Sequence, residues 1–149
     1  MRFLIQTVTE ASVKVDGAVS GSIDRGLLVF VGVGAGDDRT VADKMIRKLL
    51  AMRIFKDQNG KTNLSVKDIN GDVLIVSQFT LYADCRRGNR PSFTDASDPG
   101  TAEELYEYII SEVSKEIPNT SHGSFGADMK VSLINDGPFT IYFDSKDLK

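Results

Sequence analysis

The chain has 149 residues, of which 41% are hydrophobic and 26% are charged, and its net charge is −3. This length fits a single domain over residues 1–149, and the near-average composition excludes a disordered or fibrous protein. The negative net charge excludes a general attraction for nucleic acid, so any contact with RNA must come from a local basic patch.

Signals for membranes and disulfides are missing from the sequence. The longest apolar run, residues 26–34, is too short to cross a bilayer, and the first residues lack the long apolar core of a signal peptide. Cys85 is the only cysteine and cannot form an internal disulfide. We therefore expect a cytoplasmic protein with no membrane partner.

The first part of the chain predicts antiparallel strands. Three segments rich in β-branched residues are strand candidates: residues 2–9, 11–15 and 18–23. Asp16-Gly17 is a favoured pair for the hairpin turn between the last two. Residues 27–31 are continuously apolar, which predicts a central strand covered on both faces.

Two later segments have the periodicity of amphipathic helices. Thr40-Val41-Ala42-Asp43 has the form of a capping box, and apolar residues at spacings of three and four follow it as far as Met52. Asp98-Pro99 predicts the N-cap and first position of a second helix, which we expect to continue until Pro118.

The remaining segments predict further strands and loops. We expect a short strand at residues 53–55, mostly loop at 61–67, and a strong strand at 72–81. Period-two alternation predicts two strands, 129–134 and 139–143, as a hairpin or a pair of sheet-end strands. The sum is an α+β fold with a mainly antiparallel sheet, curled into a barrel-like core, and two amphipathic helices.

The end of the strand at 72–81 is a candidate site. Val76-Ser77-Gln78-Phe79-Thr80-Leu81 places small polar groups at the end of an apolar run, and a segment of turn formers and cations follows. Buried strands that end in polar groups beside a loop often form sites. The alternative is an ordinary strand end, where Ser and Thr satisfy nearby backbone groups.

The sequence offers little side-chain chemistry. His122 is the only histidine, so every Ser-His or Cys-His mechanism depends on it, and no acidic cluster has the spacing of metal ligands. Residues 32–36 resemble a phosphate-binding loop. However, Asp37 and Asp38 follow this stretch, and their negative charges would repel a phosphate there. The mechanism that remains is one in which backbone amides stabilise the developing negative charge and the substrate supplies the nucleophile.

Two motifs together resemble a known family. Ser77-Gln78-Phe79-Thr80-Leu81 and Asn135-Asp136-Gly137-Pro138-Phe139-Thr140 are similar to the signature pair of the D-aminoacyl-tRNA deacylases. Other segments resemble the family in the same order: Gln6 with residues 10–13, then 26–29, 53–55, 88–93 and 123–129.

The resemblance implies a homodimer that hydrolyses the ester between a D-amino acid and the terminal ribose of tRNA. Glycyl-tRNA is an implied second substrate, and no metal or organic cofactor is implied. The partner is the 3′ end of aminoacyl-tRNA. The Gly137-Pro138 bond is implied to be cis and to reach across the dimer into the partner's pocket.

The resemblance also implies a role for individual residues. Gly137 and Pro138 reject L side chains with their carbonyls, while the 2′-hydroxyl of the ribose, or a water that it activates, attacks the ester. The implied catalytic residues are Ser77, Gln78, Phe79 and Thr80, with the amides of the last two as oxyanion donors. The implied contacts with the terminal adenosine are Phe125, Ala127 and Met129. The cations expected to meet acceptor phosphates are Arg86, Arg87 and Arg90, which composition alone would place in a solvated loop.

Two positions depart from the family pattern and leave alternatives open. Thr7 stands where relatives commonly have an arginine that braces the Gly-Pro loop, and Phe139 replaces the usual valine. One alternative is a non-catalytic barrel that binds RNA or a small ligand. Another is a related deacylase with relaxed chirality and a trans Gly-Pro bond.

Overall fold

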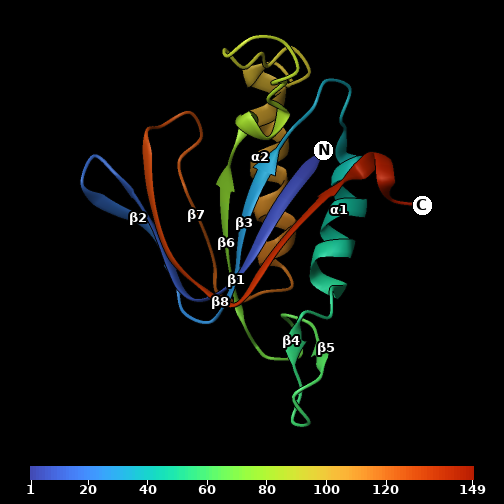
Figure 1. Ribbon diagram of the computed structural model, residues 1–149. Coiled ribbons are helices and arrows are strands. Elements are labelled where there is room, and N and C mark those ends of the chain that lie inside the picture. Colours follow the sequence, from blue (N-terminus) through green and yellow to red (C-terminus); the bar gives the residue numbers. More distant parts are fainter.

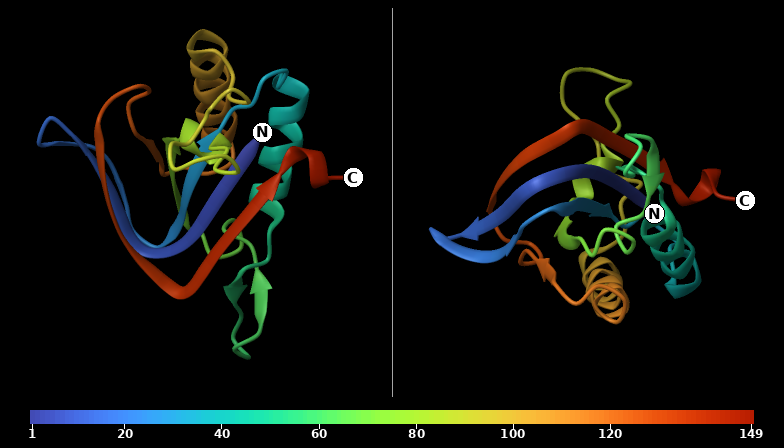
Figure 2. Two further views of the ribbon diagram at one scale, coloured as in Figure 1. Left: turned by 45° about the horizontal axis from the view of Figure 1, so that its top comes forward. Right: turned by 90° about the horizontal axis from the view of Figure 1, so that it is seen from below.

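One long, bent strand organises the sheet in the computed structural model, which describes residues 1–149. Strand β1 (Arg2–Val15) pairs antiparallel with β3 (Gly26–Gly32) along its first half and with β2 (Ala18–Ile23) along its second half. Strand β8 (Met129–Asp144) covers the other edge of β1 along nearly its whole length. Figure 2 shows β1 and β8 bending together.

Parallel pairs extend the sheet on the far side of β3. Strand β6 (Asp72–Ser77) pairs with β3, and β7 (Thr120–His122) pairs with β6. The Ser121 hydroxyl of β7 then donates to the Ser22 carbonyl of β2 over 3.1 Å, which brings the two ends of the sheet together. With three antiparallel and two parallel pairs, the expected barrel-like and mainly antiparallel sheet is confirmed.

Helices α1 (Arg39–Ala51) and α2 (Pro99–Ser114) cover one face of this sheet (Figure 1). Their apolar stripes form the main core together with β1, β3 and β6. A second, smaller core fills the opposite, concave face. Full burial of each large apolar side chain contributes roughly 1.5–3 kcal/mol, so the two cores account for the layered architecture.

The helix starts are set by aspartates. Asp98 caps α2 as predicted, and its carboxylate accepts from the Thr101 amide over 2.9 Å. The capping box at Thr40 was wrong, because Asp38 is the N-cap of α1 and accepts from the Val41 amide over 2.9 Å. Helix α2 also ends at Ser114, short of Pro118, in a tightened last turn.

The strand predicted at 72–81 stops at Ser77, and a 3₁₀ turn, η1 (Phe79–Tyr82), follows it. Glycines on β3 and just after it make this turn possible. A Cβ on Gly32 would lie 3.0 Å from the Leu81 Cβ, and one on Gly34 would lie 2.4 Å from the Tyr82 hydroxyl. The glycine-rich stretch that resembled a phosphate loop therefore makes room for η1.

The hairpin option for the last two strands was wrong. Both halves of β8 pair antiparallel with β1, so they run in one direction as a single strand with a bend at residues 135–138. The register of β1 shifts on both sides of Val8 to accommodate this bend.

The region between α1 and β6 forms a separate two-stranded ribbon, β4 (Phe55–Lys56) with β5 (Thr62–Leu64). The strand predicted at 53–55 is displaced towards Lys56, and part of the predicted 61–67 loop is strand. The chain closes with a short 3₁₀ turn, η2 (Ser145–Asp147). Neither α1 nor α2 is long and apolar enough to span a bilayer.

Candidate functional site

A cavity of about 590 Å³ opens where β6 gives way to η1. It is bounded by β3, β6, η1, α2 and the segment that leads into β8, and twelve of its 18 lining residues are hydrophobic. Ligand sites are typically apolar cavities of this kind with a few polar groups at defined positions. The polar groups at the β6 end are Ser77 and Gln78.

The structure brings six of the twelve predicted site residues to this cavity. Ser77, Gln78 and Phe79 line one wall, and the other wall includes Phe125, Ala127 and Met129. These two segments lie far apart in the sequence, and the pairing of β6 with β7 brings them together.

Thr80 differs from its neighbours because it does not line the cavity. Its hydroxyl is exposed and accepts a hydrogen bond from the Gln78 side-chain amide. Phe79 and Thr80 are the first residues of η1, so their N–H groups have no partner within that turn. The N–H groups of Phe79 and Thr80 are therefore the unused donors of this turn, while the Thr80 hydroxyl is already engaged by Gln78.

An aromatic pair stands at the mouth of the cavity. The rings of Phe79 and Phe93 meet edge to face, with centroids 5.0 Å apart, and Phe79 is 58% exposed. The exposure of a large apolar side chain beside a cavity is typical of a binding surface.

Tyr106 of α2 lines the cavity but is not among the predicted site residues. Its buried hydroxyl donates to the Ile75 carbonyl over 2.8 Å and lies 3.3 Å from the Gly123 carbonyl, and its ring packs against Phe125. Burial raises the pKa of this hydroxyl above its ordinary value. Tyr106 thus joins both walls of the cavity. A tyrosine within an apolar stripe was the available signal, because buried tyrosines usually need a polar partner.

Gly137 and Pro138 do not line the cavity of their own chain. They form the bend of β8, where Gly137 has a φ of +124° and the Gly137-Pro138 bond is cis, as the resemblance implies. Asn135 fixes this bend from one side, since its side-chain amide donates to the carbonyls of Thr7 and Phe139 over 2.9 Å each.

The three arginines also lie outside the cavity, and they differ from one another. Arg86 is engaged by Asp84, whose two carboxylate oxygens accept from the guanidinium over 2.9 and 2.7 Å. The side-chain hydrogen bond from Arg86 lowers the pKa of Asp84 to about 2. Arg87 and Arg90 are exposed and have no ion pair, so they are the freer cations for a phosphate.

His122 is exposed at the end of β7 and does not line the cavity. Its ring nitrogen Nδ1 lies 2.8 Å from the Gly123 carbonyl. No group of three His, Cys, Asp or Glu side chains is arranged to hold a metal ion.

Comparisons with known proteins give a consistent result. The model of the D-Tyr-tRNA(Tyr) deacylase family matches residues 4–144. Two similar proteins, both named D-aminoacyl-tRNA deacylase, come from Thermosipho melanesiensis and Syntrophus aciditrophicus. The first is 52% identical over 98% of both chains, and the second is 49% identical over 99% of both chains.

Solved structures share the fold. The c-Myc DNA Unwinding Element Binding Protein is 37% identical, superposes with a TM-score of 0.92, and matches 97% of this chain and 98% of its own. A probable eukaryotic D-amino acid tRNA deacylase superposes with a TM-score of 0.82 over 95% of this chain and 97% of its own. At 16% identity, the second likeness concerns the fold alone.

Proposed function

Because the chain belongs to the D-Tyr-tRNA(Tyr) deacylase family, we propose that it hydrolyses the ester bond between a D-amino acid and the terminal ribose of tRNA. The observation that carries this proposal is the family match over residues 4–144, which includes both signature motifs. The products are a free D-amino acid and tRNA. The reaction belongs in the cytoplasm, where tRNA is charged.

The cavity supports a specific division of roles. The terminal adenosine lies against Phe125, Ala127 and Met129, which places the ester near the Ser77–Phe79 wall. The N–H groups of Phe79 and Thr80 then donate to the oxyanion that forms as the ester carbonyl is attacked.

The substrate supplies the remaining chemistry. Attack by the ribose 2′-hydroxyl itself moves the aminoacyl group to the 2′-oxygen, and a water must then hydrolyse that ester. Attack by a water that the 2′-hydroxyl activates gives the free D-amino acid directly, because the tetrahedral intermediate collapses with the 3′-oxygen as leaving group. That oxygen takes up a proton as the tRNA is released. This scheme fits a cavity that no histidine lines.

A second copy of the chain discriminates between D- and L-aminoacyl groups. The outer edge of β8 has no strand partner, and Ile134 and Tyr142 on this strand are 53% and 48% exposed. An open edge with exposed apolar residues is suited to an isologous dimer. Gly137 and Pro138 of one protomer then enter the partner's cavity, where their carbonyls exclude an L side chain. Glycine has no side chain to exclude, so glycyl-tRNA is also a substrate.

Arg87 and Arg90 hold phosphates of the acceptor end, and Arg86 adds less because Asp84 already engages it. Contacts of this kind position a nucleic acid without reading its sequence.

The proposal is tested by incubating the purified protein with D-tyrosyl-tRNA and measuring the release of free D-tyrosine. Release above the uncatalysed rate is expected. Salt-sensitive binding of the tRNA without any release would instead support a non-catalytic RNA-binding barrel. Sedimentation of the protein alone tests the dimer, and a purely monomeric species at assay concentration would exclude the contribution of the partner.

A further inference from the structure

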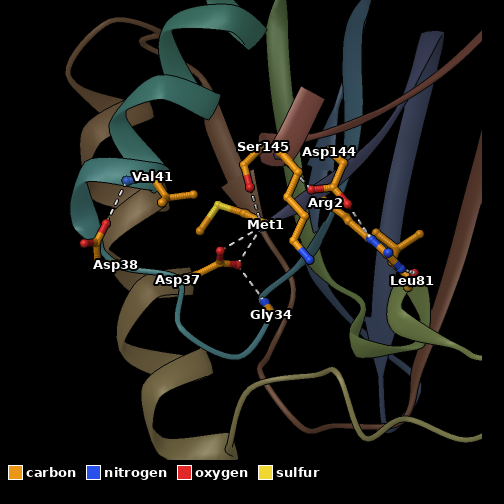
Figure 3. Close-up of polar contacts among 10 residues, drawn as sticks. Met1, Arg2, Gly34, Asp37, Asp38, Val41, Leu81, Asp144 and Ser145 are labelled. Carbon is orange, nitrogen blue, oxygen red and sulfur yellow. Dashed lines mark hydrogen bonds and ion pairs between the residues drawn. The ribbon is translucent and has the colours of Figure 1, made fainter. Parts of the chain in front are cut away.

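The side chain of Arg2 joins the end of β8 to the turn at the cavity (Figure 3). Its Nε donates to Asp144 over 2.8 Å, and its Nη1 donates to the Leu81 carbonyl over 2.9 Å. The guanidinium also lies 4.2 Å from the centroid of the Tyr82 ring. Leu81 and Tyr82 are the last two residues of η1.

From these contacts we infer that Arg2 is a positioning residue, which holds η1 so that its first amides face the cavity. The inference rests on the proposed function, because those amides are the proposed oxyanion donors. Arg2 does not line this cavity but a neighbouring one of about 540 Å³, so its link to the proposed oxyanion donors runs through η1.

The geometry of a 3₁₀ turn connects Arg2 to the Thr80 amide. Hydrogen bonds in such a turn link residues three apart, so the Tyr82 N–H faces the Phe79 carbonyl. The Tyr82 N–H belongs to the same peptide unit as the Leu81 carbonyl, which accepts from Arg2. The Phe79 carbonyl in turn shares its peptide unit with the Thr80 N–H. Because chains of hydrogen bonds polarise one another, the charge on Arg2 strengthens the Thr80 N–H as a donor.

The same contacts fix the position of η1. On one side the turn packs directly on Gly32, where a Cβ would lie 3.0 Å from the Leu81 Cβ. On another side Arg2 donates to the Leu81 carbonyl. This carbonyl has no hydrogen-bond partner within η1, because it lies at the C-terminal end of the turn. Arg2 is in turn held by Asp144, whose side chain is only 9% exposed.

Asp144 is ionised when it holds Arg2. Burial raises the pKa of its carboxyl, but the hydrogen bonds from Arg2 and from the Lys146 amide outweigh burial and leave the pKa below its ordinary value. The pair is therefore charged at neutral pH, and Arg2 can orient two of its donors at once.

Arg39 provides a matched control. It makes the same two kinds of contact, an ion pair with Glu104 at 3.2 Å and stacking 4.9 Å from the Tyr108 ring centroid, but it lies on α1 and touches no part of the cavity. Loss of Arg39 thus removes a surface ion pair and a stacked cation without changing η1.

The test is steady-state deacylation of D-tyrosyl-tRNA by the full chain and by the variants Arg2→Met, Arg2→Gln, Arg2→Lys and Arg39→Met. Removal of an oxyanion donor costs about 10²–10³ in kcat, so weakening one should cost about tenfold in Arg2→Met, with KM changed by no more than about twofold. Arg2→Lys keeps a charged donor, so its kcat should be close to that of the wild type. The kcat of Arg2→Gln should lie between those of Arg2→Met and Arg2→Lys, and the kcat of Arg39→Met should equal that of the wild type.

Wild-type kcat in Arg2→Met would overturn the inference, and so would equal losses in the Met and Lys variants. If Arg2→Met does not fold, the Gln and Lys variants decide in the same way, since a neutral donor must be slower than a charged one. Failure of the wild type itself to release D-tyrosine would refute the proposed function, and with it this role of Arg2.

Discussion

The hydroxyl of Thr7 donates a hydrogen bond to the carbonyl of Asp136, the residue immediately before Gly137. Thr7 is only 3% exposed, so this carbonyl has its partner inside the protein. Together with the two bonds from Asn135, the Thr7 hydroxyl holds the bend of β8 in place. The chain therefore braces the Gly-Pro segment with a threonine at the position where the resemblance implies an arginine.

Replacing Thr7 should loosen the reading of chirality. Thr7→Val keeps the shape of the side chain but leaves the Asp136 carbonyl without its partner, which should cost about 1–3 kcal/mol of stability. We expect the preference for D-tyrosyl-tRNA over L-tyrosyl-tRNA to fall by about fivefold or more, since 1 kcal/mol corresponds to roughly fivefold in a rate ratio. Thr7→Ser restores the hydroxyl and should keep the preference. An unchanged preference in Thr7→Val would show that the hydroxyl does not position the Gly-Pro segment.

The role given to Thr80 predicts a mild effect of losing its hydroxyl. That hydroxyl is exposed and bonded to the Gln78 side chain, and it does not line the cavity. Thr80→Ala keeps the backbone N–H, so kcat on D-tyrosyl-tRNA should stay within about threefold of the wild type. A loss of about 10⁴-fold or more, the scale on which removal of a nucleophile acts, would instead identify Thr80 as the attacking group.

The substrate-assisted step can be tested on the RNA. A D-tyrosyl-tRNA that ends in 2′-deoxyadenosine lacks the group that attacks or activates water. Its deacylation should be slower by about 10²-fold or more, as expected for loss of a positioned acid–base group. Binding of the deoxy tRNA, measured by competition against the normal substrate, should change little. Normal turnover of the deoxy substrate would exclude this mechanism.

The arginines of the 84–90 loop should differ in their effect on tRNA binding. Arg87→Ala and Arg90→Ala should each raise KM and reduce the slope of log affinity against log salt by about 0.7–0.9 if one phosphate contact is lost. Arg86→Ala should have a smaller effect because Asp84 holds its guanidinium.

The smaller effect of Arg86→Ala should not depend on pH near neutrality, because the pKa of Asp84 is lowered to about 2 in the folded protein. A carboxylate whose pKa is lowered in the folded protein contributes its full stabilisation above the ordinary pKa. This stabilisation is lost only as the pH falls towards the pKa of the folded protein. Measurements at pH 5 and pH 8 should therefore give the same ranking of the three variants. A larger effect of Arg86→Ala at either pH would show that the Asp84 pair opens to bind phosphate.

Local signals made parts of the fold predictable from the sequence. The hairpin after Asp16-Gly17, the buried strand β3 and the Asp98 cap all follow from residues close together in the chain. The continuity of β8 could not be predicted in this way, because it depends on pairing with β1, more than 110 residues earlier in the chain. The end of β6 at Ser77 depends likewise on the space that Gly32 leaves for η1.

The candidate site, too, could be predicted only where its residues lie close together in the sequence. The wall formed by Ser77, Gln78 and Phe79 was predicted from a contiguous motif. Tyr106 was missed as part of the site because its hydroxyl bonds to backbone carbonyls far away in the sequence, which leave no trace in residue type.

The most direct test of the central claim compares D-tyrosyl-tRNA and L-tyrosyl-tRNA under identical conditions, with the uncatalysed hydrolysis of each subtracted. Rejection of an L side chain by fixed backbone carbonyls predicts rapid release of D-tyrosine, while the L ester decays at its uncatalysed rate. Equal enzymatic rates on the two esters would contradict the account.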